Sequence, residues 1–238
     1  MESSVEIVSD ASALADRALT IVRSMLETAI AQQGVATIAL AGGSTPKLLY
    51  ERLATQSLPW DKLHIFWGDE RYVPPSHPDS NEGMARRAWL DRVPIPADCL
   101  HPMPTHPTEP IQAAHLYEQE LQNFFGTEVI PAFDIILLGL GDDGHTASLF
   151  PRTEVLNVCD RWIGVGSRGT DPRLTFTIPL INRARCVLFL VTGVGKHQAL
   201  RAIFDDTANP LDYPARFIQP EGQLIWLLDQ AAGDGLVQ

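Results

Sequence analysis

The sequence predicts an α/β protein with three layers, in which an open, mostly parallel sheet lies between helices on both faces. Short apolar segments alternate with amphipathic stretches, as expected of repeated strand–helix units. Two of the apolar segments, Ile135–Leu138 and Val187–Val191, lack any polar alternation, which is typical of strands covered on both faces. The length suits one large α/β domain, so we interpret residues 1–238 as a single domain.

Seven apolar segments are predicted to be strands because each is short and rich in branched or aromatic residues. They are Ala36–Leu40, Leu63–Trp67, Phe133–Leu138, Trp162–Val165, Arg173–Thr177, Val187–Val191 and Leu224–Leu228.

Five helices are expected between these strands. The first has Asp10 or Ser12 as its cap, and the second has Ser44 in the cap position with Pro46 in its first turn. The predicted helices are Asp10–Ala31, Ser44–Leu53, Asn81–Arg92, Ile111–Phe125 and Lys196–Phe204. The proline-rich stretch Pro94–Pro110, which contains His101 and His106, is interpreted as a long surface loop.

The amino-acid composition disfavours several classes of binding partner and cofactor. Lys and Arg total 18 against 29 Asp and Glu, a net charge of −11, which disfavours nucleic acid and anionic membranes. The three cysteines form no CxxC pair, and no histidine spacing suits a metal, so we expect no disulfide framework, no metal and no cofactor. The first residues do not resemble a signal peptide, and no apolar run reaches the ~20 residues of a membrane span. A cytoplasmic location is therefore expected, and the oligomeric state stays open.

Three predicted strand-to-helix junctions have unusual compositions. In open α/β sheets, ligands bind beyond the carboxyl ends of the strands. The first junction contains Gly42, Gly43, Ser44 and Thr45, whose small residues, hydroxyls and free N–H groups can hold an anion. It lacks the P-loop spacing, and the alternative is an ordinary glycine-rich turn.

The second junction places three charged residues, Asp69, Glu70 and Arg71, directly after a buried strand. Asp69 is a candidate base or orienting group, and Arg71 is a candidate clamp for a carboxylate or phosphate. The alternative is a solvated loop with a local salt bridge.

The third junction runs from Gly139 to Pro151 and includes Asp143, Gly144 and His145. Its glycines match G-x-G-x-x-G, but the acidic residues, the early proline and the missing downstream acid exclude a dinucleotide site. We expect His145 at a helix start, where the helix dipole keeps the ring neutral as a base, with Asp143 fixing its tautomer. A polar histidine without a catalytic role is the alternative.

Lys196 is predicted to open the helix that follows Val187–Val191, and Lys47 lies in another first turn. A cation there opposes the helix dipole at a cost of about 0.3–1 kcal/mol, which a bound phosphate would offset. The alternative is that each long side chain reaches into water.

Taken together, these segments resemble the 6-phosphogluconolactonase family, within the wider glucosamine-6-phosphate deaminase/isomerase-like group. The resemblance covers residues 40–200 through Ala41–Pro46, Trp67–Pro74, His77–Asn81, Gly139–Pro151, Arg173–Thr175 and Gly195–Lys196. It implies metal-independent hydrolysis of 6-phospho-D-glucono-1,5-lactone, a step of the oxidative pentose phosphate pathway.

The same resemblance implies that Arg173 and Lys196 bind phosphate beside the Gly42–Thr45 loop, and that His145 activates water with Asp143 beside it. Two alternatives remain at this point. One is a sugar-phosphate deaminase/isomerase, in which a glutamate would stand where this chain has Phe150. The other is a non-catalytic sugar-phosphate sensor.

Overall fold

The fold is built on a seven-stranded sheet in which every neighbouring pair is parallel. The computed structural model describes residues 2–105, 109–126 and 129–236, so His106 lies outside the described residues. The strand order is β1-β10-β9-β6-β2-β3-β5. The strands are β1 (Glu2–Val8), β2 (Ala36–Leu40), β3 (Leu63–Trp67), β5 (Leu100–His101), β6 (Ile135–Leu138), β9 (Cys186–Val191) and β10 (Gln223–Asp229).

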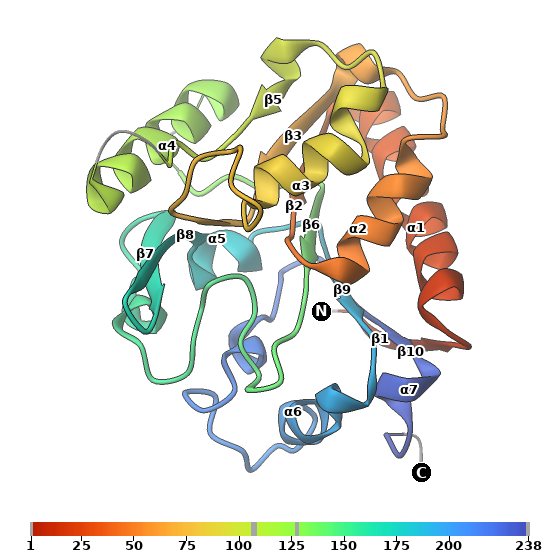
Figure 1. The fold of residues 1–238 in the computed structure, drawn as a ribbon, viewed down its shortest axis with the longest axis vertical. Helices are drawn as coiled ribbons and strands as arrows, with labels where there is room; N and C mark the ends of the chain where they lie inside the picture. Colours follow the sequence, from red (N-terminus) through yellow and green to blue (C-terminus); the bar gives the residue numbers. More distant parts are fainter. Residues whose placement is uncertain (1, 106–108, 127–128, 237–238) are drawn as a thin grey trace.

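Helices cover both faces of this sheet, which confirms the predicted three-layer architecture. Figure 1 shows α1, α2 and α3 on one side and α4 and α5 on the other. The helices are α1 (Ala11–Gln33), α2 (Ser44–Leu53), α3 (Asn81–Ala88), α4 (Pro110–Phe125), α5 (Ile178–Asn182), α6 (His197–Ile203) and α7 (Gln230–Gly233). Among the described residues, no helix is long and apolar enough to cross a membrane.

Two strands of the sheet were not predicted. The edge strand β1 leaves Val5 and Ile7 exposed, so its composition lacks the uniformly apolar pattern of a central strand. The short strand β5 lies inside the proline-rich stretch and pairs with Ile65 and Phe66 of β3. The prediction that residues 94–110 form only a surface loop was therefore wrong, since His101 is buried in this stretch.

A second, three-stranded antiparallel sheet lies beside the main one. It consists of β4 (Asp69–Arg71), β8 (Asp171–Phe176) and β7 (Ile163–Arg168), in the order β4-β8-β7. The predicted strands near 162–165 and 173–177 exist, but they form the hairpin β7–β8 instead of extending the parallel sheet. This hairpin packs against α4.

Two helix starts were predicted from capping residues, and the structure confirms one of them. The side chain of Asp10 caps α1 by accepting a hydrogen bond from the backbone N–H of Ala13 at 2.9 Å. In α2, by contrast, Gly43 occupies the cap position instead of Ser44, with φ at 104°. Glycine adopts this backbone conformation without steric cost, and Ser44 becomes the first residue of the helix.

Candidate active site

The predicted site residues come from several elements that end at one edge of the parallel sheet. Because the strands are parallel, the carboxyl ends of β2, β6 and β9 meet there, and β4 and β8 of the second sheet lie alongside. A cavity of about 240 Å³ opens at this edge. Of the predicted residues, Gly42, Asp69, Arg71, His145, Arg173 and Lys196 line it.

The remaining predicted residues lie next to this cavity. Gly43, Ser44 and Thr45 line an adjoining hollow, which we call the loop hollow and which also includes Gly42 and Lys196. Asp143 and Gly144 lie in the segment that carries His145. The fold therefore brings together three junctions that span about a hundred residues of the sequence.

His145 is held by Asp143. The Oδ1 atom of Asp143 accepts one hydrogen bond from Nδ1 of His145 at 2.5 Å and another from the His145 backbone N–H at 3.1 Å. The hydrogen bond from the imidazole lowers the pKa of Asp143 to about 2, so the carboxyl group is ionised at neutral pH. With the Nδ1 proton directed at Asp143, the Nε2 atom of a neutral ring keeps the free lone pair.

His145 does not begin a helix, so this part of the prediction was wrong. Residues 139–150 form a sequence of turns, closed by an isolated bridge between Thr146 and Leu149. No helix dipole acts on the ring here, and the Asp143 carboxylate is the group that orients it. Pro151 follows the segment directly, and its ring is incompatible with a continuing helix.

Glycine is required where this segment turns. A Cβ atom on Gly141 would lie 2.0 Å from Nδ1 of His145, and one on Gly144 would lie 2.7 Å from the Tyr213 ring. Gly144 also has φ at +80°, a conformation that favours glycine. The tight turn that results brings Asp143 and His145 together.

Phe150 packs between the histidine and an arginine. Its ring centroid lies 4.5 Å from that of His145, and the guanidinium carbon of Arg173 lies 5.8 Å from the same centroid. A cation over an aromatic face is attracted by the ring quadrupole. Phe150 has no group that can hydrogen-bond to His145. Among the described residues, Asp143 is the one polar protein partner of the His145 ring nitrogens.

Asp69 ties the His145 segment to the second sheet. Its Oδ2 atom accepts a hydrogen bond from the hydroxyl of Ser148 at 2.7 Å. Asn81 donates from Nδ2 to the backbone carbonyl of Asp69 at 2.9 Å and accepts from Arg71 at 2.6 Å. The predicted charged triplet is therefore an ordered network and not a solvated loop.

Glu70, in the middle of that triplet, is buried and stabilises the start of α3. Its two carboxyl oxygens accept hydrogen bonds from the backbone N–H groups of Asn81 and Glu82, each at 2.7 Å, and from the hydroxyl of Ser80. Burial raises the pKa of Glu70 to about 7, against the opposing effect of these hydrogen bonds. Glu70 thus holds Asn81 in position, and Asn81 holds Arg71.

The glycine–serine loop is anchored at both ends. The hydroxyl of the buried Tyr50 donates to the carbonyl of Ala41 at 2.7 Å and accepts from its N–H at 3.0 Å. At the other end, Thr45 and Thr192 share a hydrogen bond of 2.7 Å between their hydroxyls. These hydrogen bonds hold the loop in one conformation, which lowers the entropic cost of binding an anion there.

Two lysines, Lys47 and Lys196, were predicted in the first turns of helices, and the structure gives them different surroundings. Lys196 lines both the cavity and the loop hollow, and its Nζ atom lies 2.5 Å from Oδ1 of Asp142. Lys47 instead pairs with Glu51 on the exposed surface of α2 and lines neither. Of the two interpretations of Lys47, an exposed side chain that reaches into water therefore fits the structure better than a phosphate partner.

Arg71, Arg168 and Arg173 place three positive charges on one wall of the cavity. Burial lowers the pKa of Arg173, and the positive charges of Arg71 and Arg168 add to this effect. The Nε atom of Arg173 is buried and has no hydrogen-bond partner. In a chain with a net charge of −11, this local excess of cations is suited to an anionic ligand.

Sequence reasoning missed several residues of the site. Arg168 gave no signal, because a lone arginine at the tip of a hairpin has the composition of an ordinary exposed loop. Ser148 and Asn81 lie within segments that carried the family resemblance, but neither was assigned a role. Among the described residues, no group of three or more His, Cys, Asp or Glu side chains is arranged to hold a metal ion.

The chain is similar in sequence to known proteins. The sequence model of the family described as glucosamine-6-phosphate isomerases/6-phosphogluconolactonase matches residues 9–226. The chain is 60% identical over 238 residues to a 6-phosphogluconolactonase of Synechocystis sp., covering 99% of each. It is 57% identical over 235 residues to a 6-phosphogluconolactonase of Nostoc sp., covering 98% of each.

Two solved structures share the fold of this chain. The 6-phosphogluconolactonase of Trypanosoma brucei superposes with a TM-score of 0.90 at 32% identity, covering 99% of both chains. A monomeric glucosamine-6-phosphate deaminase shares the fold, with a TM-score of 0.81 at 20% identity, covering 98% of this chain and 99% of the other. From the extent of the sequence match and these identities, the chain belongs to the family of glucosamine-6-phosphate isomerases and 6-phosphogluconolactonases.

Proposed function

We propose that this chain hydrolyses 6-phospho-D-glucono-1,5-lactone to 6-phospho-D-gluconate, as its relatives' names indicate for them. The observation that carries the proposal is the hydrogen-bonded pair of Asp143 and His145, whose ring lines the same cavity as Lys196 and Arg173. One cavity thus combines a general base with cations that suit a phosphate. The enzyme would act in the cytoplasm as a single domain on a small molecule, without nucleic acid or membrane partners.

The reaction requires one water molecule and no cofactor. His145 takes a proton at Nε2 from water, and the oxygen attacks the lactone carbonyl carbon to give a tetrahedral oxyanion. The C1–O5 bond then breaks, and His145 returns its proton to O5, which becomes the C5 hydroxyl. The new carboxyl group loses its proton to solvent, and Asp143 stabilises the imidazolium between the two steps.

The phosphate is bound by the loop of Gly42, Gly43, Ser44 and Thr45 together with Lys196 and Arg173. The position of Lys196, which lines both the loop hollow and the cavity, supports its role as a phosphate partner. Arg173 lines the cavity but not the loop hollow, so it approaches the phosphate from the side of His145.

Arg71 and Asp69 have supporting parts in this proposal. Arg71 is fixed by Asn81 and faces the cavity, where it orders water and the sugar hydroxyls with Asp69. Asp69 also holds Ser148, so it keeps the His145 segment in place. Gly144 provides the turn that the segment needs, and its backbone approaches the substrate.

Two other functions are weaker on structural grounds. A deaminase/isomerase on this fold would orient its histidine with a carboxylate at position 150, whereas Phe150 contacts His145 only through its ring. A non-catalytic sensor would bind the phosphate without needing the short contact between Asp143 and His145. The assays below separate both from a lactonase.

The test is hydrolysis of freshly prepared lactone, measured in a coupled assay with spontaneous opening subtracted, beside glucono-δ-lactone without phosphate. Loss of two or three charge-assisted contacts at about 1.5–3 kcal/mol each should lower kcat/KM at least ~10²-fold. Part of this loss should fall on kcat, because remote binding energy orients the reacting carbonyl. Equal efficiency on both lactones would indicate a general lactonase, and turnover of an amino sugar phosphate alone would indicate a deaminase.

A further inference from the structure

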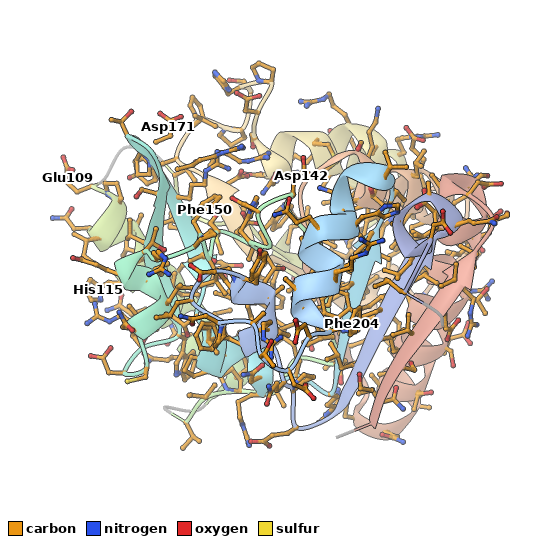
Figure 2. The ribbon with its side chains drawn as sticks, turned by 90° about the horizontal axis from the view of Figure 1, so that it is seen from below. Glu109, His115, Asp142, Phe150, Asp171 and Phe204 are labelled. Atoms are coloured by element: carbon orange, nitrogen blue, oxygen red, sulfur yellow. The ribbon has the colours of Figure 1, made fainter. Side chains whose placement is uncertain are left out.

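Lys196, the cation of the loop hollow, already has an anionic partner within the chain. Its Nζ atom lies 2.5 Å from Oδ1 of Asp142. Asp142 immediately precedes Asp143, so the partner comes from the segment that carries His145. Figure 2 shows Asp142 beside the light-blue helix α6, which Lys196 immediately precedes.

The two members of this pair differ in exposure. The side chain of Lys196 is 22% exposed, whereas that of Asp142 is 75% exposed. Among the described residues, Lys196 is the one side chain that pairs with the Asp142 carboxylate. Asp142 can therefore leave Lys196 and return to water at little cost, because ion pairs with an exposed member are weak.

A phosphate bound in the loop hollow would compete with Asp142. An ammonium group has three N–H donors, and one of them is directed at Asp142. A phosphate oxygen on Lys196 would lie within a few ångströms of the Asp142 carboxylate, and two negative charges at that distance repel each other. The phosphate must either displace Asp142 or bind against its charge.

We infer that Asp142 is an internal competitor for the phosphate group on Lys196, and that it sets how tightly the site holds phosphorylated ligands. This inference rests on the proposed phosphate role of Lys196. Substrate and product carry the same phosphate, so the competition weakens both. Weakening binding uniformly raises KM without lowering kcat, and it favours release of the product.

The test is Asp142→Asn, which keeps the shape of the side chain and removes its charge. Titration with 6-phosphogluconate should show binding that is tighter by about three- to tenfold, from loss of the exposed pair and of the repulsion. KM for the phosphorylated lactone should fall by a similar factor. Selectivity over the unphosphorylated lactone, as a ratio of kcat/KM values, should rise accordingly.

Two matched controls isolate the cause. Asp160→Asn removes the same charge from an exposed pair with Arg161, outside the cavity and the loop hollow, and it should leave binding unchanged. Asp142→Glu keeps the charge and should bind 6-phosphogluconate within about twofold of the wild type. Equal tightening in Asp160→Asn and Asp142→Asn would overturn the inference, because net charge alone would then explain it.

A double-mutant cycle tests whether Asp142 acts through Lys196. In a Lys196→Met background the ion pair is absent and only the repulsion between Asp142 and the phosphate remains, so Asp142→Asn should have a smaller effect on 6-phosphogluconate affinity. An undiminished effect there, or weaker or unchanged binding in the single variant, would overturn the inference. A wild-type enzyme that does not open the lactone would instead refute the proposed function, so the two failures are distinguishable.

Discussion

Asp143→Asn tests the mechanism most directly, because the substitution preserves shape and removes charge. The Asp143 Oδ1 atom accepts from both the ring and the backbone N–H of His145, and an amide oxygen can accept the same two hydrogen bonds. What the variant loses is the negative charge that faces the imidazolium once water has given up its proton. An amide can also turn its NH₂ group toward Nδ1, which would leave Nε2 protonated and unable to act as a base.

The size of the effect follows from exposure. The same change in a buried carboxylate–histidine pair lowers kcat about 10⁴-fold. The side chain of Asp143 is 50% exposed, so solvent screens part of its charge. We therefore expect kcat for the phosphorylated lactone to fall by about 10- to 10²-fold, with little change in KM, because Asp143 lies outside the loop hollow.

The assay is initial-rate hydrolysis with spontaneous lactone opening subtracted, together with titration of 6-phosphogluconate. Product affinity close to that of the wild type would show that the cavity is intact. A variant that retains more than about a third of the wild-type kcat would refute the assigned role of Asp143. A loss confined to KM would also refute it, because the carboxylate would then act in binding.

Stability against pH gives an independent check on the same contact. Folding lowers the pKa of Asp143 from 3.8 to about 2, so the contact stabilises the fold above pH 3.8 and this contribution disappears as the pH falls to about 2. After allowance for solvent screening, it is below about 1 kcal/mol. The stability difference between wild type and Asp143→Asn should shrink as the pH falls from about 4 to about 2, as measured by urea unfolding.

Three further predictions concern the base, the phosphate partners and the metal. His145→Ala should fold and bind 6-phosphogluconate while kcat falls by about 10²–10⁴-fold, and near-normal turnover would exclude His145 as the base. Lys196→Ala and Arg173→Ala should each weaken 6-phosphogluconate binding by about 1.5–3 kcal/mol in calorimetry. Lys47→Ala should not, because Lys47 pairs with Glu51 and lines neither the cavity nor the loop hollow. Unchanged affinity in both site variants would place the phosphate elsewhere. EDTA should leave activity intact, and activity restored by a divalent ion would contradict a metal-free mechanism.

The central strands were predictable because burial on both faces leaves a continuous apolar segment in the sequence. Ile135–Leu138 and Cys186–Val191 are fully buried, so every position is apolar whichever way it points. Residues 3–8 of the edge strand β1 are exposed or only partly buried, and the strand carries serine and glutamate, so its pairing with β10 leaves a weak pattern in the sequence. The second sheet was missed because its hairpin and Asp69–Arg71 are about a hundred residues apart.

The residue types of the site were visible in the sequence, but their partners were not. The motif around His145 indicated the pair with Asp143, because two residues in one turn can contact each other without help from the rest of the chain. In the sequence, Glu70 lies in a charged triplet typical of a solvated loop. Its burial is explained only by the structure, in which the first backbone N–H groups of α3 donate hydrogen bonds to its carboxyl group. Arg168 lies at the end of β7, and it reaches the cavity because β7 pairs with β8 in a hairpin, a contact that the sequence did not indicate.

By itself, the sequence determined the fold class, the three junctions and the contact between Asp143 and His145, since these depend on composition and short spacing. Tertiary structure alone decided which cations share a cavity. Lys47 and Lys196 have equivalent places in sequence, yet one pairs with Glu51 on the surface and the other faces the loop hollow beside Asp142. The physical reason is that a side chain's charge acts over a few ångströms, and those distances are set by packing between segments far apart in the chain.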